Sequence, residues 1–298
     1  YRRIFLFNIV GQREINTLFW GRYITALFGV GVVFLTYLLG DKFFGKVTGL
    51  AASLFVAVNF RQVLNSHIGL PDIYNAFFLL LSLLVSLRLW ENPSKKNYIT
   101  TAFVAGISFS IKYQVYSLIP LALVHLALSV KPKKWKDKLK FLFNPRFLIT
   151  PFAFLLVVLL INPYHLIRWD EMVAILTYVK SKYGFGVNVL NLYPISYLYQ
   201  HGVGKAMSFL VVAGLFYGLI KYFWKSIFLL SVIFPFFLTF VYLSRGGFYT
   251  RNFVTIIPLC LIFAGLSLQL VNLIFKKIFI NKIIVCLATI IFTIVVSW

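Results

Sequence analysis

The feature that most constrains this sequence is a succession of long apolar runs separated by short polar connections. Because an α-helix needs about 20 mostly apolar residues to cross the hydrocarbon core of a bilayer, such runs predict membrane-spanning helices. A composition of 61% hydrophobic and only 12% charged residues argues against a soluble globular protein. We therefore predict an all-α, polytopic transmembrane helix bundle with about ten spans, near residues 24–39, 47–60, 73–90, 99–111, 115–130, 147–163, 206–220, 226–243, 252–275 and 283–297.

The net charge of +22 would suit a nucleic-acid-binding protein. However, the basic residues lie in the short connections and not on one face interleaved with stacking aromatic side chains, so we expect no nucleic-acid partner. Cytoplasmic loops of membrane proteins carry an excess of Lys and Arg. One set of alternate connections holds 16 of these residues and the other set holds 8. We assign the less basic set to the extracytoplasmic side, together with the N-terminal residues: 1–22, 61–72, 112–114, 164–205 and 244–251.

This assignment predicts the organisation of the chain. Residues 1–22 form the tail of an outer juxtamembrane loop, and residues 23–298 form a membrane domain whose longest outer loop is 164–205. The densest charge run, KPKKWKDKLK (131–140), lies in a cytoplasmic loop that faces lipid headgroups. Most residues able to do chemistry then share the outer face.

Asp72 is one of only seven acidic residues and stands at the start of a long apolar run, in the stretch NSHIGLPDIYNAFF. One interpretation is structural: an acid just after Pro71 accepts backbone N–H groups at the start of a helix. The other is functional, because ionisable groups near hydrocarbon by default mark function or pairing. The two roles are compatible, and we interpret Asp72 as a candidate catalytic base.

Basic residues on the same predicted face suit an anionic substrate, since cations bind phosphate while an acid takes a proton from an attacking hydroxyl. Lys112 and Tyr113 lie in a very short connection, where the ammonium group stays near the headgroup plane or simply snorkels. Arg245 and Arg251 bracket GGFYT and either clamp phosphate or anchor the interface.

Two histidines and two acids complete the outer set. His67 and His165 are either metal ligands or proton shuttles, or interfacial hydrogen-bonding residues. Asp170 and Glu171 either begin a helix in the long loop or contribute to an acceptor-binding surface. Whether a divalent metal ion is required is left open.

Five segments, in their order along the chain, resemble successive blocks of the polytopic GT-C glycosyltransferases. They are GRYITALFGVGVVFLTYLLGDKFFGK, NSHIGLPDIYNAFF, GISFSIKYQVYSLIPL, INPYHLI and RGGFYTRNFVTIIPLCLIFAG. The branch that they are most similar to contains the dolichyl- or polyprenyl-phosphate-sugar transferases related to protein O-mannosyltransferases and aminoarabinose transferases. The similarity covers most of residues 20–270 and is specific for the superfamily but not for the substrate.

By this resemblance, Asp72 matches the acidic position at the outer start of a span, following Ser66 and His67. Lys112 and Tyr113 match a frequent K-Y pair, and Arg251 matches a basic residue that opens a late span. The resemblance also implies that the family's first span and the front of its first outer loop, which usually carries another essential acid, lie before Tyr1.

The implied activity is transfer of a sugar, with inversion, from a polyprenyl-phosphate carrier to a glycan, lipid or protein acceptor at the extracytoplasmic face of the cell membrane. The candidate residues are Asp72 and His67 for catalysis, Lys112, Tyr113, Arg245 and Arg251 for the lipid phosphate, and His165, Asp170 and Glu171 for the acceptor or its loop.

Two other function classes remain open from the sequence. A transporter or lipid flippase also needs many spans and outer charges, but such proteins often place charges at mid-membrane, whereas here the charges cluster at one face. A noncatalytic assembly subunit is the third hypothesis, because the additional acid of the family's first outer loop is not in this sequence.

Overall fold

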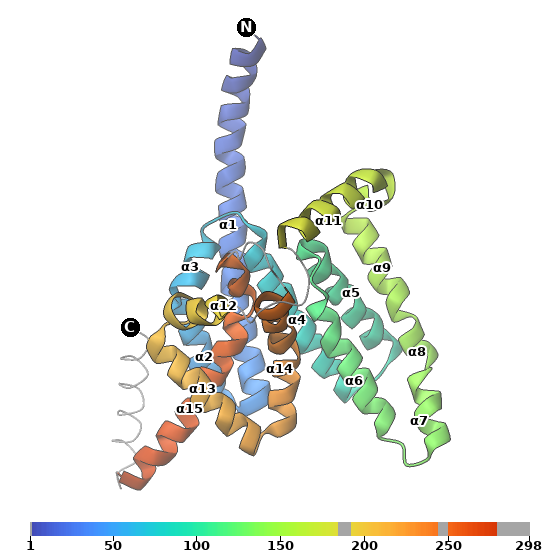
Figure 1. Cartoon of the computed structure of the whole chain (residues 1–298), viewed down its shortest axis with the longest axis vertical. Helices are drawn as coiled ribbons and strands as arrows, with labels where there is room; N and C mark the ends of the chain where they lie inside the picture. Colours follow the sequence, from blue (N-terminus) through green and yellow to red (C-terminus); the bar gives the residue numbers. More distant parts are fainter. Residues whose placement is uncertain (1, 184–191, 244–249, 279–298) are drawn as a thin grey trace.

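The computed structural model describes residues 2–183, 192–243 and 250–278, and these are helical with short connections and no strand (Figure 1). The α-helices are α1 (Arg2–Phe44), α2 (Lys46–Val58), α3 (Phe60–Ser66), α4 (Pro71–Glu91), α5 (Lys95–Lys112), α6 (Ile119–Val130), α7 (Trp135–Leu142), α8 (Pro145–Leu148), α9 (Thr150–Ile161), α10 (Tyr164–Ile167), α11 (Trp169–Tyr183), α12 (Tyr193–Tyr197), α13 (Lys205–Lys221), α14 (Phe223–Leu238) and α15 (Ile257–Ile278). Short 3₁₀ segments are η1 (Val115–Leu118) and η4 (Thr250–Thr255), and π-helical segments are η2 (Leu198–Gly202) and η3 (Thr239–Leu243).

The predicted all-α membrane bundle is confirmed, but the number of clear spans is lower than ten. In the described part of the chain, five helices are long and apolar enough to cross a membrane, and up to seven if each of two bent pairs counts as one span. The bends are 61° between α2 and α3 and 112° between Tyr193–Gly202 and α13. The expected spans 99–111 and 115–130 are helical, but α5 carries three lysines in its 18 residues and the second is only a short apolar helix. The expected span 283–297 lies outside the described residues.

The main core forms around α15, which packs against α2 and α13. Its residues from Ile257 to Leu268 are almost entirely buried, and α1, α4 and α14 add further apolar side chains to this cluster. A second, smaller cluster centres on Leu89 of α4, Tyr98 of α5 and Leu121 of α6. The first cluster takes in α4 residues from Ile73 to Leu84 and the second takes in Leu89, so α4 contributes to both clusters.

Glycines allow the close approach of α13 to α15. A Cβ atom placed on Gly214 would lie 1.8 Å from the carbonyl oxygen of Phe263, which is backbone and cannot move aside like a side chain. Small residues at helix interfaces are the usual means by which membrane helices pack closely.

Replacing Gly214 with alanine is therefore expected to destabilise the protein by about 1–3 kcal/mol, the usual cost of overpacking. The measurement is thermal unfolding of the purified protein in detergent. Gly21→Ala is the matched control, because a Cβ at Gly21 would meet nothing within 4 Å. Equal unfolding temperatures for the two variants would contradict the packing described for α13 and α15.

The charged residues gather at two opposite ends of the bundle. At the end where α4 finishes, Lys42 of α1 forms an ion pair with Glu91 at 2.9 Å, and the ammonium group of Lys131 lies 3.8 Å from the centre of the Trp90 ring. Helix α7, from the basic run 131–140, has no buried residue and lies at this same end, at the lower right of Figure 1. The beginning of α4, with α10 and α11, lies at the other end.

Candidate active site

Asp72 lies in the first turn of α4, and its side chain is fully buried. Pro71 occupies the first helical turn, where its missing N–H costs nothing. The residue that precedes the helix, Leu70, has no side-chain capping hydrogen bond, and the carboxylate of Asp72 is directed elsewhere. The position of Asp72 is thus that of a helix start, but its interactions are not those of a cap.

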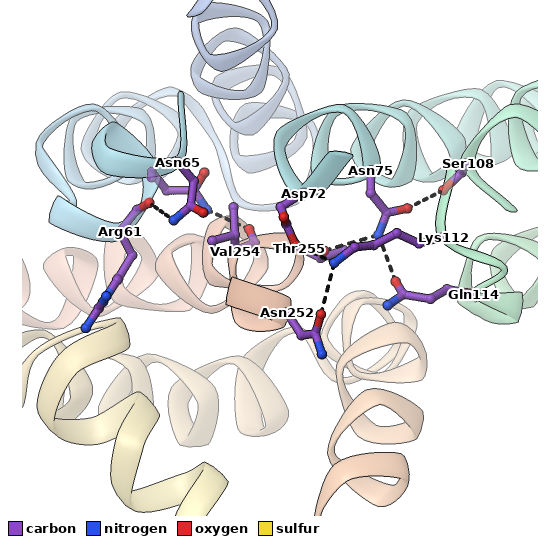
Figure 2. A network of polar contacts seen from close by, with 11 residues as sticks. Arg61, Asn65, Asp72, Asn75, Ser108, Lys112, Gln114, Asn252, Val254 and Thr255 are labelled. Carbon is purple, nitrogen blue, oxygen red and sulfur yellow. Dashed lines mark hydrogen bonds and ion pairs between the residues drawn. The ribbon is translucent and has the colours of Figure 1, made fainter. Parts of the chain in front are cut away.

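The partner of Asp72 is Lys112, at the end of α5 (Figure 2). The Lys112 ammonium group forms an ion pair with Oδ1 of Asp72 and donates a second hydrogen bond, at 3.0 Å, to Oδ1 of Asn252 in η4. The Lys112 side chain is only 13% exposed, so it does not snorkel into the headgroup region. An ammonium group has three donors, which leaves one for a further acceptor.

The second carboxylate oxygen of Asp72, Oδ2, is buried and has no hydrogen-bond partner. Leaving a charged buried oxygen unsatisfied is costly, and such groups in native structures call for an explanation. An incoming hydroxyl group would satisfy this oxygen. The pair thus presents one engaged oxygen and one oxygen able to accept a proton.

Asn75, one turn after Asp72, connects the same segments (Figure 2). Its side-chain amide donates to Oε1 of Gln114 at 2.7 Å and to the hydroxyl of Thr255 at 3.1 Å, and its oxygen accepts a hydrogen bond of 3.4 Å from the hydroxyl of Ser108. These bonds join α4, α5, the connection after α5, and η4. They fix the elements that carry Lys112 and Asn252.

Replacing Asn75 with leucine is expected to destabilise the protein by about 1–3 kcal/mol, because polar partners in a buried network lose their hydrogen bonds. Thermal unfolding in detergent measures the change. Asn97→Leu on α5 is the matched control, since the Asn97 amide makes an exposed hydrogen bond to the carbonyl oxygen of Asn92. If Asn97→Leu destabilises the protein as much as Asn75→Leu, the buried hydrogen bonds of Asn75 do not contribute more to stability than an exposed hydrogen bond.

Tyr113 and His165 are also brought together. Tyr113 ends α5 in the left-handed region with φ 53°, the only described residue other than glycine with a positive φ. Its hydroxyl and Nε2 of His165 in α10 are 3.0 Å apart, and the two rings are 5.5 Å apart. Asn162, three residues before His165, donates to the carbonyl oxygen of Ser110 at 3.1 Å. The segment that follows α9 is therefore attached to the end of α5, beside Lys112.

Arg251 lies in η4 next to Asn252 and close enough to Lys112 for the two positive charges to repel each other. Gln62 of α3 donates a hydrogen bond of 2.6 Å to the carbonyl oxygen of Val254, which fixes η4 against α3. Two cations held near one another favour an anion between them. Arg245, the other arginine of this predicted pair, lies outside the described residues.

The remaining described candidates, His67, Asp170 and Glu171, form no hydrogen bond or ion pair with Asp72 or Lys112. His67 ends α3 and is exposed, and its Nδ1 is 2.7 Å from the carbonyl oxygen of Val63, so its ring is engaged with its own helix. Asp170 and Glu171 lie in the first turn of α11, which confirms the predicted helix start. Glu171 forms an exposed ion pair with Arg168.

The described residues do not fit a metal site. No group of three or more His, Cys, Asp or Glu side chains in the described ranges could hold a metal ion. Asp72 is instead paired with Lys112, and Glu171 is paired with Arg168. We therefore derive no chemistry from a metal.

Four site residues were not identified from the sequence: Asn75, Gln114, Asn252 and Thr255. Two of them carry a usable signal. Asn75 interrupts the apolar run after Asp72, and Asn252 follows the candidate Arg251 directly. A polar residue one helical turn from a candidate acid is a reasonable partner for the site.

A family model described as dolichyl-phosphate-mannose-protein mannosyltransferase matches residues 5–157, which include Asp72, Lys112 and Tyr113. This chain belongs to that family. The resemblance to GT-C glycosyltransferases that the sequence motifs indicate is thus confirmed. No curated protein matches this member of the mannosyltransferase family.

Solved structures share the fold of this mannosyltransferase-family chain. The Archaeoglobus fulgidus oligosaccharyltransferase, in a complex with Zn and sulfate, is similar with a TM-score of 0.53 and 14% identity, covering 93% of this chain and 40% of that one. ArnT from Cupriavidus metallidurans, in the apo state, has a TM-score of 0.56 and 14% identity, covering 83% of this chain and 45% of that one. This chain spans less than half the length of either structure. At these identities, the likeness establishes the fold alone.

Proposed function

We propose that this protein is a membrane glycosyltransferase that moves a sugar from a polyprenyl-phosphate carrier to a hydroxyl-bearing acceptor at the extracytoplasmic face of the cell membrane. The observation that carries the proposal is the buried carboxylate of Asp72, in which Oδ1 is paired with Lys112 and Oδ2 has no partner. Membership of the mannosyltransferase family supports the donor class.

In the proposed reaction, Oδ2 of Asp72 accepts the proton of the acceptor hydroxyl as its oxygen attacks the anomeric carbon of the sugar. The bond between that carbon and the phosphate oxygen breaks on the opposite face, so the configuration inverts. The leaving phosphate takes up the bonding electrons as negative charge. The free donor of Lys112 and the guanidinium of Arg251 stabilise this charge.

The residues around this centre have proposed roles in binding. Tyr113, which is hydrogen-bonded to His165, is a proposed ligand of the lipid phosphate, and His165 belongs to the proposed acceptor side. Asp170 and Glu171 on α11 belong to the acceptor surface, and Arg245 is a second phosphate ligand. The proposed proton route does not include His67, since its Nδ1 lies 2.7 Å from the carbonyl oxygen of Val63 in its own helix.

The test is reconstitution of the full-length parent protein in liposomes with a panel of polyprenyl-phosphate sugars and with glycan, lipid and peptide acceptors. Transfer of sugar from at least one carrier, with inversion at the anomeric carbon, is the expected result. Movement of the carrier or sugar across the bilayer with no transfer product would instead support the transporter or flippase hypothesis. If neither transfer nor transport is observed, the assembly-subunit hypothesis is favoured.

The proposed sidedness has its own test in intact cells. Trp169 on α11 and Trp135 on α7 are 59% and 70% exposed. The helices α11 and α7 lie at opposite ends of the bundle (Figure 1). A cysteine at position 169 is expected to react with a membrane-impermeant thiol reagent, and a cysteine at position 135 is expected to react only after the membrane is opened. If the cysteine at position 135 reacts in intact cells and the cysteine at position 169 does not, the protein has the opposite orientation from the one proposed.

A further inference from the structure

A cavity lies at the end of the bundle opposite Asp72, where α1 finishes and α2 begins. Its volume is about 270 Å³, and its lining includes Gly45, Lys46, Tyr217, Lys221, Gln269 and Asn272. Four helices meet there, namely the end of α1, the start of α2, the end of α13, and α15. The proposed glycosyltransferase chemistry makes no use of this cavity.

The cavity is positively charged. Lys46 and Lys221 line it, no acidic side chain does so among the described residues, and Asp41, one turn earlier in α1, is not part of the lining. The Lys221 ammonium group donates to the hydroxyl of Tyr217 at 2.9 Å and also interacts with the side chain of Tyr222, which leaves one of its three donors for an anion. Lys46 lines the same cavity and adds a second positive charge.

The polar lining is held firmly. The side-chain amide of Gln269 donates to the carbonyl oxygen of Phe44 at 2.7 Å and to the hydroxyl of Thr48 at 2.9 Å. These bonds tie α15 to the junction of α1 and α2. Gly45, at this junction, has no side chain with which to cap α2, and the first turn of α2 contains no acid, so its backbone N–H groups add to the positive character of the cavity.

Apolar side chains continue from the cavity along α2. Val47, Leu50, Leu54 and Val58 follow one another on one face of the helix and are 51%, 62%, 41% and 47% exposed. Leu273 of α15, which also lines the cavity, is 47% exposed. A cationic cavity that opens onto an apolar helix face matches a molecule with an anionic head and hydrocarbon chains.

We propose that this cavity binds the phosphate-bearing headgroup of an anionic membrane lipid, with the acyl chains along α2. Basic pockets between membrane helices are suited to such headgroups. The site is separate from the proposed donor site, since it lies at the other end of the bundle, and its occupancy does not depend on the proposed transfer reaction.

The first test is native mass spectrometry of the full-length protein in detergent with phosphatidylglycerol as the probe. The double variant Lys46→Gln and Lys221→Gln is expected to bind phosphatidylglycerol more weakly by about fivefold for each lysine removed. The matched control is Lys136→Gln with Lys138→Gln, two lysines of α7 that lie at the same end but outside the cavity. Binding of phosphatidylcholine is expected to be equal in all three proteins.

If both double variants lose phosphatidylglycerol binding equally, the proposal is overturned, because binding would then depend on surface charge alone. Competition by millimolar inorganic phosphate would overturn the lipid assignment in favour of a free phosphate. A photoactivatable phosphatidylglycerol makes the test independent of variants: cross-links to the unmodified protein are expected in residues 44–58 and 269–273. Cross-links confined to residues 131–146 would overturn the proposal.

Discussion

Replacing Asp72 with asparagine is expected to reduce sugar transfer by about 10²–10⁴-fold, the usual contribution of a general base. Asparagine keeps the shape of the side chain but cannot accept the proton of the acceptor hydroxyl. The measurement is the rate of transfer from a polyprenyl-phosphate sugar by the reconstituted full-length protein, expressed per folded molecule. The folded amount is determined by size-exclusion chromatography, since the substitution also breaks an ion pair.

Helix α4 supplies a matched control for this experiment. Glu91, at its other end, is paired with Lys42 as Asp72 is paired with Lys112, but that pair is largely exposed, with side-chain exposures of 34% for Lys42 and 57% for Glu91. Glu91→Gln is expected to leave the transfer rate unchanged. A transfer rate for Asp72→Asn within a few-fold of the wild type would remove Asp72 from the reaction, whatever happens at Glu91.

Replacing Lys112 with methionine is expected to lower the free energy of unfolding by about 3–5 kcal/mol, the cost of removing one partner of a buried ion pair. The reason is that Asp72, which is 0% exposed, would be left as an uncompensated buried charge. Thermal or denaturant unfolding in detergent measures the effect, with Lys42→Met as the control at the exposed pair. The expected cost of that control is at most about 1 kcal/mol.

The double variant Asp72→Asn with Lys112→Met separates the loss of the pair from the burial of a single charge. It is expected to recover much of the stability that Lys112→Met loses, because no unpaired carboxylate remains. The rate of sugar transfer by the double variant is expected to be no higher than that of Asp72→Asn. If the double variant is less stable than Lys112→Met, the ion pair is not the source of the destabilisation.

The sequence predicted the helix start at Asp72, which the structure confirms, and it predicted that Asp72 and Lys112 lie on the same side of the membrane. The predicted topology makes α4 and α5 antiparallel neighbours, with the start of α4 and the end of α5 on the same side. It therefore places Asp72 and Lys112 at the same end of the two helices. The sequence did not predict that they form a pair. Snorkelling of Lys112 was an equal alternative, and only the packing of α4 against α5 and η4 shows that the ammonium group is buried.

No sequence pattern predicts that η4 contributes to the site. Asn252 follows Lys112 by 140 residues, and no periodicity connects a short 3₁₀ segment to the end of α5. The described residues contain fewer clear spans than expected partly for a local reason. Asn59 ends α2 in an extended conformation and its side chain caps α3, so α2 has only 13 residues and continues into α3 at an angle of 61°.

The order of the three side chains along the chain has a consequence for biogenesis. Asp72 and Lys112 are 40 residues apart and belong to adjacent helices, so both leave the ribosome long before Asn252. Each charge alone is expensive to insert into a bilayer, whereas a helical hairpin of α4 and α5 can enter the translocon with the two charges already neutralised. Asn252 then joins a pair that exists, and the site closes only when the late helices have been integrated.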